Sequence, residues 1–265
     1  MKKKIEPLES YIEQLEDKIV QLSMKHKNLS NNFNQYKKEN KLLLGKLTHN
    51  LKNPIGVIYS FSEMMLENIE NYNPEKLIKY SNVIYNSAEY SLDLLSTFAK
   101  AVSLKSDDFK LNIEYQNFHE LINDIVTGFK KKYTDYNILL NTNAPISLKL
   151  NFDYSELKIA LENIINNAIS YSTSDTNINI LVSTNEQELI LSIEDEGIGI
   201  EPKYISKVFD EFFVVNTYDV HQKKSLGLGL TIAKKIISLH KGSIEIKSES
   251  NKGTIVLIKL PIKKC

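Results

Sequence analysis

The 265-residue chain contains no arginine, a single cysteine and no long apolar run. Without arginine, every cationic contact to a phosphate must come from lysine, a point charge that lacks the bidentate guanidinium fork. The one cysteine, Cys265, excludes an intrachain disulfide and fits a reducing compartment. No stretch approaches the roughly 18 uninterrupted apolar residues of a membrane span, and Met1–Lys4 leads into charged sequence rather than a signal-peptide core. We therefore expect a cytoplasmic protein.

The chain also has no excess of charge of either sign. The 33 basic residues, all of them lysine, balance 33 acidic residues, and the formal net charge at pH 7 is zero. The lysine-rich spots at 2–4, 130–132 and 223–224 are scattered, whereas nucleic-acid-binding proteins gather their basic residues on one face. We therefore expect no nucleic-acid partner. With 42% apolar and 25% charged residues, the composition is that of a globular chain with room for one or two domains.

The first fifty residues carry a heptad repeat of mostly apolar side chains. Alternating steps of three and four residues connect Ile5, Leu8, Ile12, Leu15, Ile19, Leu22, His26, Leu29, Phe33, Tyr36, Asn40, Leu43 and Leu47. More than three unbroken heptads favour a coiled coil over a surface helix. Asn40 falls at an a position, where a buried amide commonly fixes register and a two-stranded parallel pairing. His26, at another a position, is more simply a tolerated polar core residue than a pH switch.

The apolar stripe continues to Ile69 and breaks at residues 71–74, where Pro74 suits the first turn of a new helix. A second stripe runs from Leu77 to Val102. Two long helices with wide apolar faces form a hairpin that cannot bury those faces alone. A dimer of hairpins, which is a four-helix bundle, buries them. The sequence therefore predicts a homodimer.

Beyond a polar break at 105–108 the hydrophobic periodicity changes to a mixture of short strands and helices. We expect strands at 111–115, 138–141, 148–152, 178–183, 189–194, 243–248 and 254–260, helices at 118–133, 154–171 and 228–240, and an irregular stretch at 200–226. This pattern predicts a two-layer α/β sandwich. The predicted fold class is α+β multidomain: a parallel coiled coil at 1–40, a dimerisation hairpin at 41–104 and an α/β domain at 105–265.

Short elements between residues 163 and 229 point to a nucleotide site. Asn163 and Asn167 lie four residues apart and share one helix face, and their amide oxygens suit Mg²⁺. Asp195 ends an apolar run and can accept a hydrogen bond from an exocyclic amine. Gly197 and Gly199 let the backbone approach a flat ligand.

Gly227 and Gly229 stand where a lysine-rich loop becomes a helix, and a helix N-terminus offers free N–H groups to phosphate. Each of these elements alone is weak evidence, because a lone Gly-x-Gly is a turn more often than a site. All of them in one order favour a nucleotide site.

His49 lies off the apolar stripe, about 200° around the helix from both Leu47 and Leu51, so its imidazole should face solvent. Asn53, four residues later, shares its face, and Pro54 should kink the helix. An exposed histidine on a helix is usually a surface residue without a specific role. Beside a nucleotide site and a dimeric bundle, it becomes a candidate phosphoryl acceptor.

These motifs resemble those of the HisKA-type sensor histidine kinases of two-component signalling, from about residue 40 to the end. Residues 49–54 resemble the phospho-acceptor box, 163–171 the N box, 195–199 the first glycine box, 208–213 the F box and 227–230 the second glycine box. Five motifs in family order are highly specific. The resemblance implies a histidine-phosphotransfer bundle followed by a GHKL-type (Bergerat) ATP-binding domain, with ATP and Mg²⁺ as cofactors.

The resemblance also implies a role for each matching residue. His49 would be the catalytic phosphoryl acceptor with Asn50 and Asn53 beside it, and Asn167 would hold Mg²⁺. The residues implied in nucleotide binding are Asn163, Asn167, Tyr171, Asp195, Gly197, Gly199, Ile200, Phe209, Lys223, Lys224, Gly227, Leu228, Gly229 and Thr231.

Four positions depart from the family pattern. Asn50 replaces an acidic residue that would accept the Nδ1 proton of the histidine; an amide can accept this hydrogen bond but brings no charge. The other departures are Ser170 for a lysine, Val214 where a basic residue often follows the F box, and Ser225 for a glycine. Lys223 and Lys224 could supply the missing cations.

The sequence therefore predicts an ATP-dependent protein histidine kinase. It would phosphorylate His49, pass the phosphoryl group to an aspartate of a response regulator receiver domain, and use Asn53 in the reverse, phosphatase, activity. Three alternatives remain open: a kinase-weak and phosphatase-biased enzyme, suggested by Asn50; a nucleotide-binding pseudokinase that acts as a dimeric scaffold; and another GHKL ATPase, disfavoured by the histidine hairpin that precedes the domain.

Overall fold

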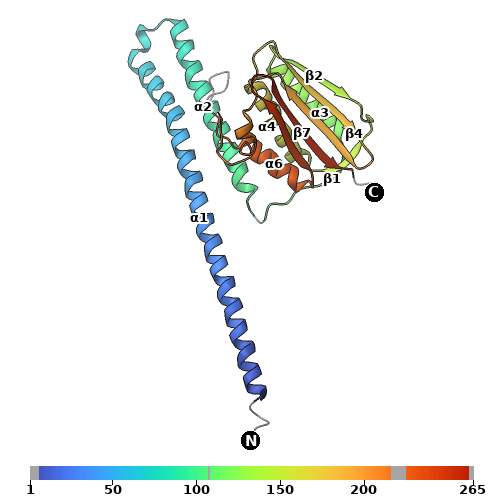
Figure 1. The fold of residues 1–265 in the computed structure, drawn as a ribbon. Helices are drawn as coiled ribbons and strands as arrows, with labels where there is room; N and C mark the ends of the chain where they lie inside the picture. The colour runs from blue at the N-terminus through green and yellow to red at the C-terminus, as the bar shows by residue number, and fades with distance from the viewer. Residues whose placement is uncertain (1–5, 107, 216–224, 263–265) are drawn as a thin grey trace. The chain divides into compact units, whose positions relative to one another are not determined.

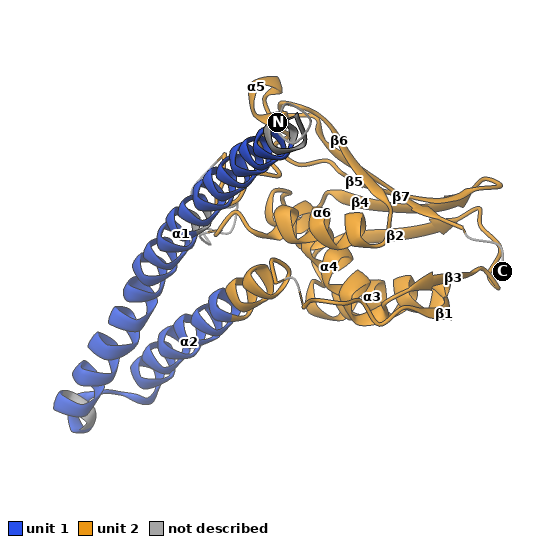
Figure 2. Cartoon of the chain, turned by 90° about the horizontal axis from the view of Figure 1, so that it is seen from below, with its two compact units in different colours: residues 1–95 blue, residues 96–265 orange. Residues whose placement is uncertain are grey.

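The computed structural model describes residues 6–106, 108–215 and 225–262 (Figure 1). None of the helices within these residues is long and apolar enough to cross a membrane. The chain divides into two compact units, residues 1–95 and residues 96–265, which Figure 2 colours separately.

Two long helices and the turn between them make up the first unit. Its elements are α1 (Glu6–Asn68), the 3-10 turn η2 (Ile69–Asn71) and α2 (Pro74–Ser103), whose last turns belong to the second unit. α1 continues through Pro54, so this proline does not end the helix. The break expected at 71–74 is present. The side-chain oxygen of Asn73 accepts a hydrogen bond from the backbone N–H of Lys76 at 2.9 Å, and Pro74 takes the first helical position.

The apolar heptad positions between Ile12 and Phe33 of α1 are exposed in the single chain, whereas Leu43 is buried. Ile19, Leu22, Leu29 and Phe33 have 60% to 67% of their surface accessible to solvent. A row of large apolar side chains along one helix is typical of a surface that packs against another helix. The coiled coil expected at 1–40 stays a prediction, and this row is the surface that it would bury.

The second unit is a two-layer α/β sandwich in which α3, α4 and α6 cover one face of a five-stranded sheet (Figure 2). The sheet order is β2-β4-β5-β7-β6. Among the described strands, β2 and β4 are the one parallel pair, and β1 and β3 form a separate antiparallel pair. The helices are α3 (Phe118–Lys132), α4 (Tyr154–Ser170), α5 (Pro202–Ile205) and α6 (Gly229–Leu239). The strands are β1 (Glu114–Asn117), β2 (Asn137–Thr142), β3 (Lys149–Phe152), β4 (Asn177–Thr184), β5 (Glu188–Asp195), β6 (Ser243–Glu249) and β7 (Gly253–Pro261).

Side chains of β5 alternate between the two faces of the sheet, and this alternation places both an apolar row and the Asp195 carboxylate on the buried face. Leu189, Leu191 and Ile193 are at most 1% exposed, because every second residue of a strand points to the same side. Asp195 is the next residue in this row and is itself only 7% exposed. The same periodicity that builds the apolar core therefore carries one acidic side chain into it.

The expected elements and the observed ones differ mainly at two places. β1 begins at Glu114, three residues later than expected, because the backbone N–H of Asn112 donates to Asp153 Oδ2 at 2.7 Å instead of to a neighbouring strand. The other oxygen of Asp153 caps α4 by accepting from the N–H of Glu156 at 3.0 Å. The stretch expected to be irregular at 200–226 contains the short helix α5.

A largely buried ion pair joins the end of α2 to the start of α4. The ammonium of Lys100 contacts Oε1 of Glu156, and the two side chains are 19% and 13% exposed. Oε2 of Glu156 is buried and makes no hydrogen bond within the described residues. Within the described residues, Lys100 is therefore the cation paired with this carboxylate.

We expect Lys100→Met to lower the free energy of unfolding by about 2 kcal/mol, because it leaves the buried Glu156 carboxylate without its cation. Urea denaturation of the full chain measures the change. Lys79→Met, at an exposed position of the same helix, is the matched control and should stay within about 0.5 kcal/mol of the parent. Equal effects of the two substitutions would contradict the assigned role of the pair.

Candidate nucleotide site

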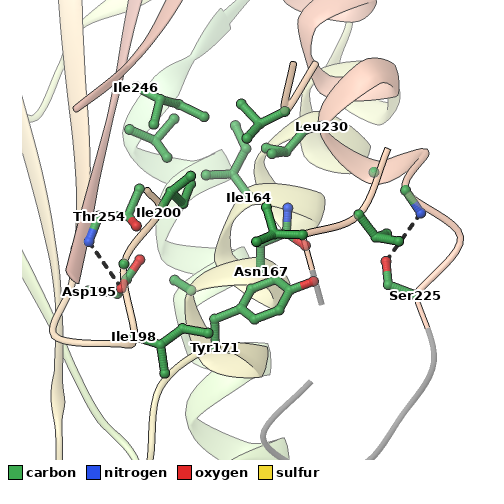
Figure 3. A pocket seen from close by; sticks show the side chains of 18 of the residues that line it. Ile164, Asn167, Tyr171, Asp195, Ile198, Ile200, Ser225, Leu230, Ile246 and Thr254 are labelled. Atoms are coloured by element: carbon green, nitrogen blue, oxygen red, sulfur yellow. Dashed lines mark hydrogen bonds between the residues drawn. The ribbon is translucent and has the colours of Figure 1, made fainter. Parts of the chain in front are cut away.

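A pocket opens in the second unit between α4, the paired ends of β5 and β7, and the segments 208–215 and 225–230 (Figure 3). Among the expected residues, its lining includes Asn167, Tyr171, Asp195, Gly199, Ile200, Gly227 and Gly229. Most of the remaining lining is aliphatic, from residues such as Ile164, Ile193, Leu230, Ile246 and Val256. An apolar cavity with one carboxylate suits a flat, largely apolar ring that carries a hydrogen-bond donor.

Asp195 is the acidic group of this pocket (Figure 3). Its Oδ1 accepts hydrogen bonds from the backbone N–H of Gly197 at 3.0 Å and of Thr254 at 3.2 Å. Among the described residues, both hydrogen bonds to this carboxylate end on Oδ1. The two N–H groups fix the orientation of the side chain and leave Oδ2 as an acceptor for a ligand.

Burial raises the pKa of Asp195 from its usual 3.8 to about 6, against the two backbone N–H groups that lower it. The nearby Glu194 adds a smaller contribution in the raising direction. At neutral pH the carboxylate is therefore ionised, but at an energetic cost that a partner in the pocket can offset. A donor such as an exocyclic amine would provide that compensation.

The first glycine pair is required by close contacts of the backbone. A Cβ at Gly197 would lie 2.3 Å from the carbonyl oxygen of Tyr171 and 2.9 Å from Oδ1 of Asp195. Gly199 has a φ of +64°, and a Cβ there would lie 2.0 Å from the carbonyl oxygen of Glu249. Gly199 lines the pocket, whereas Gly197 is not part of its lining. Because neither glycine carries a Cβ, the loop after β5 can pack closely against these carbonyl groups.

The two asparagines of α4 have different surroundings. Asn167 and Tyr171 line the pocket, one turn apart. The amide of Asn163 donates to the carbonyl of Ile159 at 2.9 Å, and this side chain is not part of the pocket lining. Its Oδ1 would lie 2.9 Å from a Cβ at Gly229. The structure therefore places Asn163 against the start of α6 rather than on the cavity wall.

The second glycine element forms the N-terminus of α6. Leu228 is the N-cap residue, is fully buried and supplies no side-chain cap, so the first-turn N–H groups are not satisfied by the cap. Gly229 lines the pocket at this end. The hydroxyl of Thr231 donates to the carbonyl of Phe209 at 3.0 Å, which ties the helix to the segment before it. A helix terminus of this kind suits phosphate oxygens.

The outcomes for Ile200, Phe209, Lys223 and Lys224 differ from one another. Ile200 lines the pocket, and its N–H donates to Oγ of Ser248 at 2.8 Å. Phe209 does not line it; the ammonium of Lys234 lies 4.8 Å from its ring centroid. Lys223 and Lys224 lie outside the described residues.

Thr254 is the main functional residue that the sequence motifs did not identify. It donates to Asp195 from β7, which pairs with β5 in the register Asp195↔Thr254. These residues are 59 positions apart, and no local pattern relates them. The pairing of the two strands would have found it, but pairing is not readable from hydrophobic periodicity.

The donor set fits a magnesium nucleotide better than a protein-held metal. Groups of three or more His, Cys, Asp or Glu side chains able to hold a metal do not occur within the described residues. Asn167 offers one amide oxygen beside the uncapped end of α6. Mg²⁺ commonly takes few protein ligands and completes its coordination with phosphate oxygens and water.

His49 and its neighbours lie on α1, in the first unit. The side chains of His49 and Asn53 are exposed and that of Asn50 is half-buried. Oδ1 of Asn50 lies 3.4 Å from Nδ1 of His49, so an imidazole protonated at Nδ1 donates a long hydrogen bond to the amide oxygen. That tautomer leaves Nε2 with its lone pair facing away from this bond.

The raised pKa of Asp195 predicts a stability cost. Its folded-state pKa of about 6 exceeds the usual 3.8, so ionisation destabilises the ligand-free domain as pH rises between these values, by up to about 3 kcal/mol. Asp195→Asn keeps the acceptor oxygen without the charge. We expect this variant to be more stable than the parent above pH 6, with the difference vanishing below pH 4, in thermal unfolding across this pH range. An unchanged difference at all pH values, or the same profile for the exposed control Asp135→Asn, would contradict this.

Comparison with known proteins agrees with this geometry. Residues 152–264 match the family described as histidine kinase-, DNA gyrase B- and HSP90-like ATPases. Sensor protein SrrB of Staphylococcus aureus (strain N315) is 28% identical over 255 residues, which are 95% of this chain and 43% of that protein. The chain thus spans less than half the length of this relative.

Solved structures give the same result for the fold. The Acinetobacter baumannii histidine kinase AdeS superposes with a TM-score of 0.64 and 22% identity, covering 82% of this chain and 98% of that chain. Histidine kinase ThkA, in a complex with the response regulator protein TrrA, gives a TM-score of 0.64 and 26% identity over 83% of this chain and 60% of that chain. The chain is therefore similar to sensor histidine kinases over most of its length, and its residues 152–264 match the family of histidine kinase-, DNA gyrase B- and HSP90-like ATPases.

Proposed function

We propose that this chain is an ATP-dependent protein histidine kinase that phosphorylates His49 and passes the phosphoryl group to an aspartate of a response regulator. The observation that carries the proposal is the pocket around the buried Asp195 carboxylate, in a chain that also presents the exposed His49 imidazole on a helical hairpin. Similarity to a sensor protein over 95% of the chain supports reading the two features together.

ATP would bind in the pocket with its adenine between the aliphatic walls. The exocyclic amine would donate to Oδ2 of Asp195, the acceptor that the backbone N–H groups leave available. The phosphates would lie at the N-terminus of α6, beside Gly229, and Asn167 would give its amide oxygen to Mg²⁺. Lys223 and Lys224 would add positive charge at the phosphates. Bound Mg²⁺ supplies charge neutralisation on the phosphate oxygens.

Phosphoryl transfer would use the Nε2 atom of His49. With its proton on Nδ1 and donated to Asn50, the neutral imidazole presents the Nε2 lone pair to the γ-phosphorus. An Nε2–P bond forms in line as the bond from phosphorus to the bridging oxygen breaks, and ADP leaves with that electron pair. Because this chemistry requires little from the protein beyond positioning and charge stabilisation, the exposed imidazole is sufficient as the acceptor.

Asn50 favours a second candidate, a kinase-weak and phosphatase-biased enzyme. An amide oxygen 3.4 Å from Nδ1 can hold the imidazole tautomer, but it has no negative charge to stabilise the positive charge that develops on the ring. Asn53 is exposed on the same helix one turn later and would orient a water molecule toward the phosphorylated histidine. This arrangement would favour hydrolysis relative to phosphorylation.

The oligomer and partners follow from the helices. We infer a homodimer, with a parallel coiled coil at 1–40 and a four-helix bundle at 41–104 preceding the catalytic domain at 105–265. The exposed apolar positions of α1 support this inference, since a second copy would bury them. The complex of ThkA with the response regulator TrrA supports a receiver domain as the partner of this chain also.

Nucleotide binding should depend on Asp195 and Asn167 in different ways. Asp195→Asn should weaken ATP binding with or without Mg²⁺, by about tenfold or more, because a charge-assisted hydrogen bond to the base is weakened. Asn167→Ala should weaken only the Mg²⁺-dependent part of binding. Calorimetric titration with ATP, in Mg²⁺ and in a chelator, measures both effects. Parent-like affinity of both variants under both conditions would show that the site is elsewhere.

Restoring a carboxylate at position 50 should speed the chemical step. We expect Asn50→Asp or Asn50→Glu to raise the initial rate of autophosphorylation about tenfold or more without changing ATP affinity, because position 50 contacts Nδ1 of His49 and not the nucleotide. Acid-labile label from radioactive ATP gives the rate. His49→Ala must abolish the label in each background. A rate that is unchanged or lower would indicate that another step limits the reaction, such as closure of the site.

A further inference from the structure

A second ion pair connects the end of α2 to the wall of the pocket. The ammonium of Lys105 lies 2.8 Å from the carboxylate of Glu211, and the two side chains are 29% and 33% exposed. Lys105 stands in the turn that follows α2, where its N–H donates to the carbonyl of Val102 at 3.1 Å. The pair joins residues 106 positions apart, so it fixes the distance between two separate segments.

Glu211 belongs to a segment, residues 208–215, that lines the nucleotide pocket. Val208, Phe213, Val214 and Val215 of this segment are part of the pocket wall. Its backbone also contains a non-glycine residue in a left-handed conformation, Phe212 with a φ of +62°. Such a conformation persists only where the surroundings hold it.

Two hydrogen bonds and an ion pair hold the backbone around Phe212 in this conformation. The N–H of Phe212 donates to the carbonyl of Gly227 at 2.9 Å, and the carbonyl of Phe209 accepts from the hydroxyl of Thr231 at 3.0 Å. These contacts come from the α6 side. The ion pair with Lys105 adds a contact from the turn that follows α2.

We propose that Lys105 is a positioning residue of the nucleotide pocket, which acts through Glu211 to hold the 208–215 segment against the bound nucleotide. The proposal rests on the proposed ATP binding and extends it to the end of α2. Since nucleotide and ion pair would stabilise the same arrangement of this segment, a shift of the last turn of α2 changes nucleotide affinity, and nucleotide in turn strengthens the pair.

The surroundings of Lys105 separate it from ordinary surface ion pairs. The preceding Leu104 is 4% exposed, and Lys100 anchors the last turn of α2 on Glu156, so the Lys105 side chain projects from a fixed backbone. By contrast, the pairs Lys203–Glu201 and Lys252–Glu249 are more than half exposed and join residues two or three positions apart. Exposed ion pairs of that kind contribute little to stability, because solvent and salt screen the attraction between the two charges.

The test is the affinity of the full chain for ATP·Mg²⁺, measured by calorimetry. Lys105→Met and Glu211→Gln should each raise the dissociation constant about two- to fivefold, the range expected for a partly buried pair. Lys105→Arg should retain the parent affinity, and the double variant should be no weaker than either single variant, because both changes remove the same interaction. The matched control Lys131→Met removes an equal charge from the exposed end of α3 and should leave the affinity unchanged.

Two further readouts distinguish positioning from a general loss of stability. The difference between the parent and Lys105→Met should shrink at about 1 M salt, since screening weakens the pair in the parent. In autophosphorylation, the variant should raise the KM for ATP more than it lowers kcat.

Equal affinity of the parent, Lys105→Met and Glu211→Gln would overturn this proposal and leave the proposed function intact. An additive loss in the double variant, or a loss that Lys105→Arg does not restore, would also overturn it. A parent chain that does not bind ATP·Mg²⁺ would overturn both proposals.

Discussion

A carboxylate held out of water is the constraint on which the nucleotide pocket depends. Asp195 lies at the end of an apolar row on the central strand β5, and within the described part of the chain two backbone N–H groups stabilise its charge. Burial raises its pKa to about 6, so the ionised form is destabilised in the empty pocket. A ligand with a suitably placed donor recovers part of this energy. The cost in stability and the proposed preference for a base with an exocyclic amine would therefore have one cause.

The rest of the pocket is arranged around that side chain. Gly197 and Gly199 allow the loop after β5 to pack within a distance that no side chain would tolerate, and Thr254 reaches Asp195 because β7 is its neighbour in the sheet. At the opposite end, α6 begins without a side-chain cap. In the proposed site, the carboxylate would recognise the base and the helix end the phosphates, with the apolar cavity between them, an arrangement that suits a nucleotide.

Most of the fold could be predicted from the sequence. In strands and helices with strong apolar periodicity, such as β5 and α4, the pattern indicates both the type of element and its buried face. The late start of β1 could not, since it depends on a hydrogen bond from Asn112 to the distant Asp153. The pocket residues that stand in motifs were predictable in the same way. The position of Asn163 against Gly229 was not predictable, because it depends on how α4 packs on α6. The contact of Thr254 with Asp195 was not predictable either, because it depends on strand pairing. Contacts between distant segments are a property of the tertiary structure, which local patterns do not contain.

The most direct test of the account is a crystal structure of the full chain with Mg²⁺ and a nonhydrolysable ATP analogue. The account predicts the exocyclic amine of adenine within hydrogen-bond distance of the Asp195 carboxylate, the phosphates at the N-terminal turn of α6, and Mg²⁺ bound to Oδ1 of Asn167. An analogue bound with its base away from Asp195, or with its phosphates away from Gly229, would contradict it.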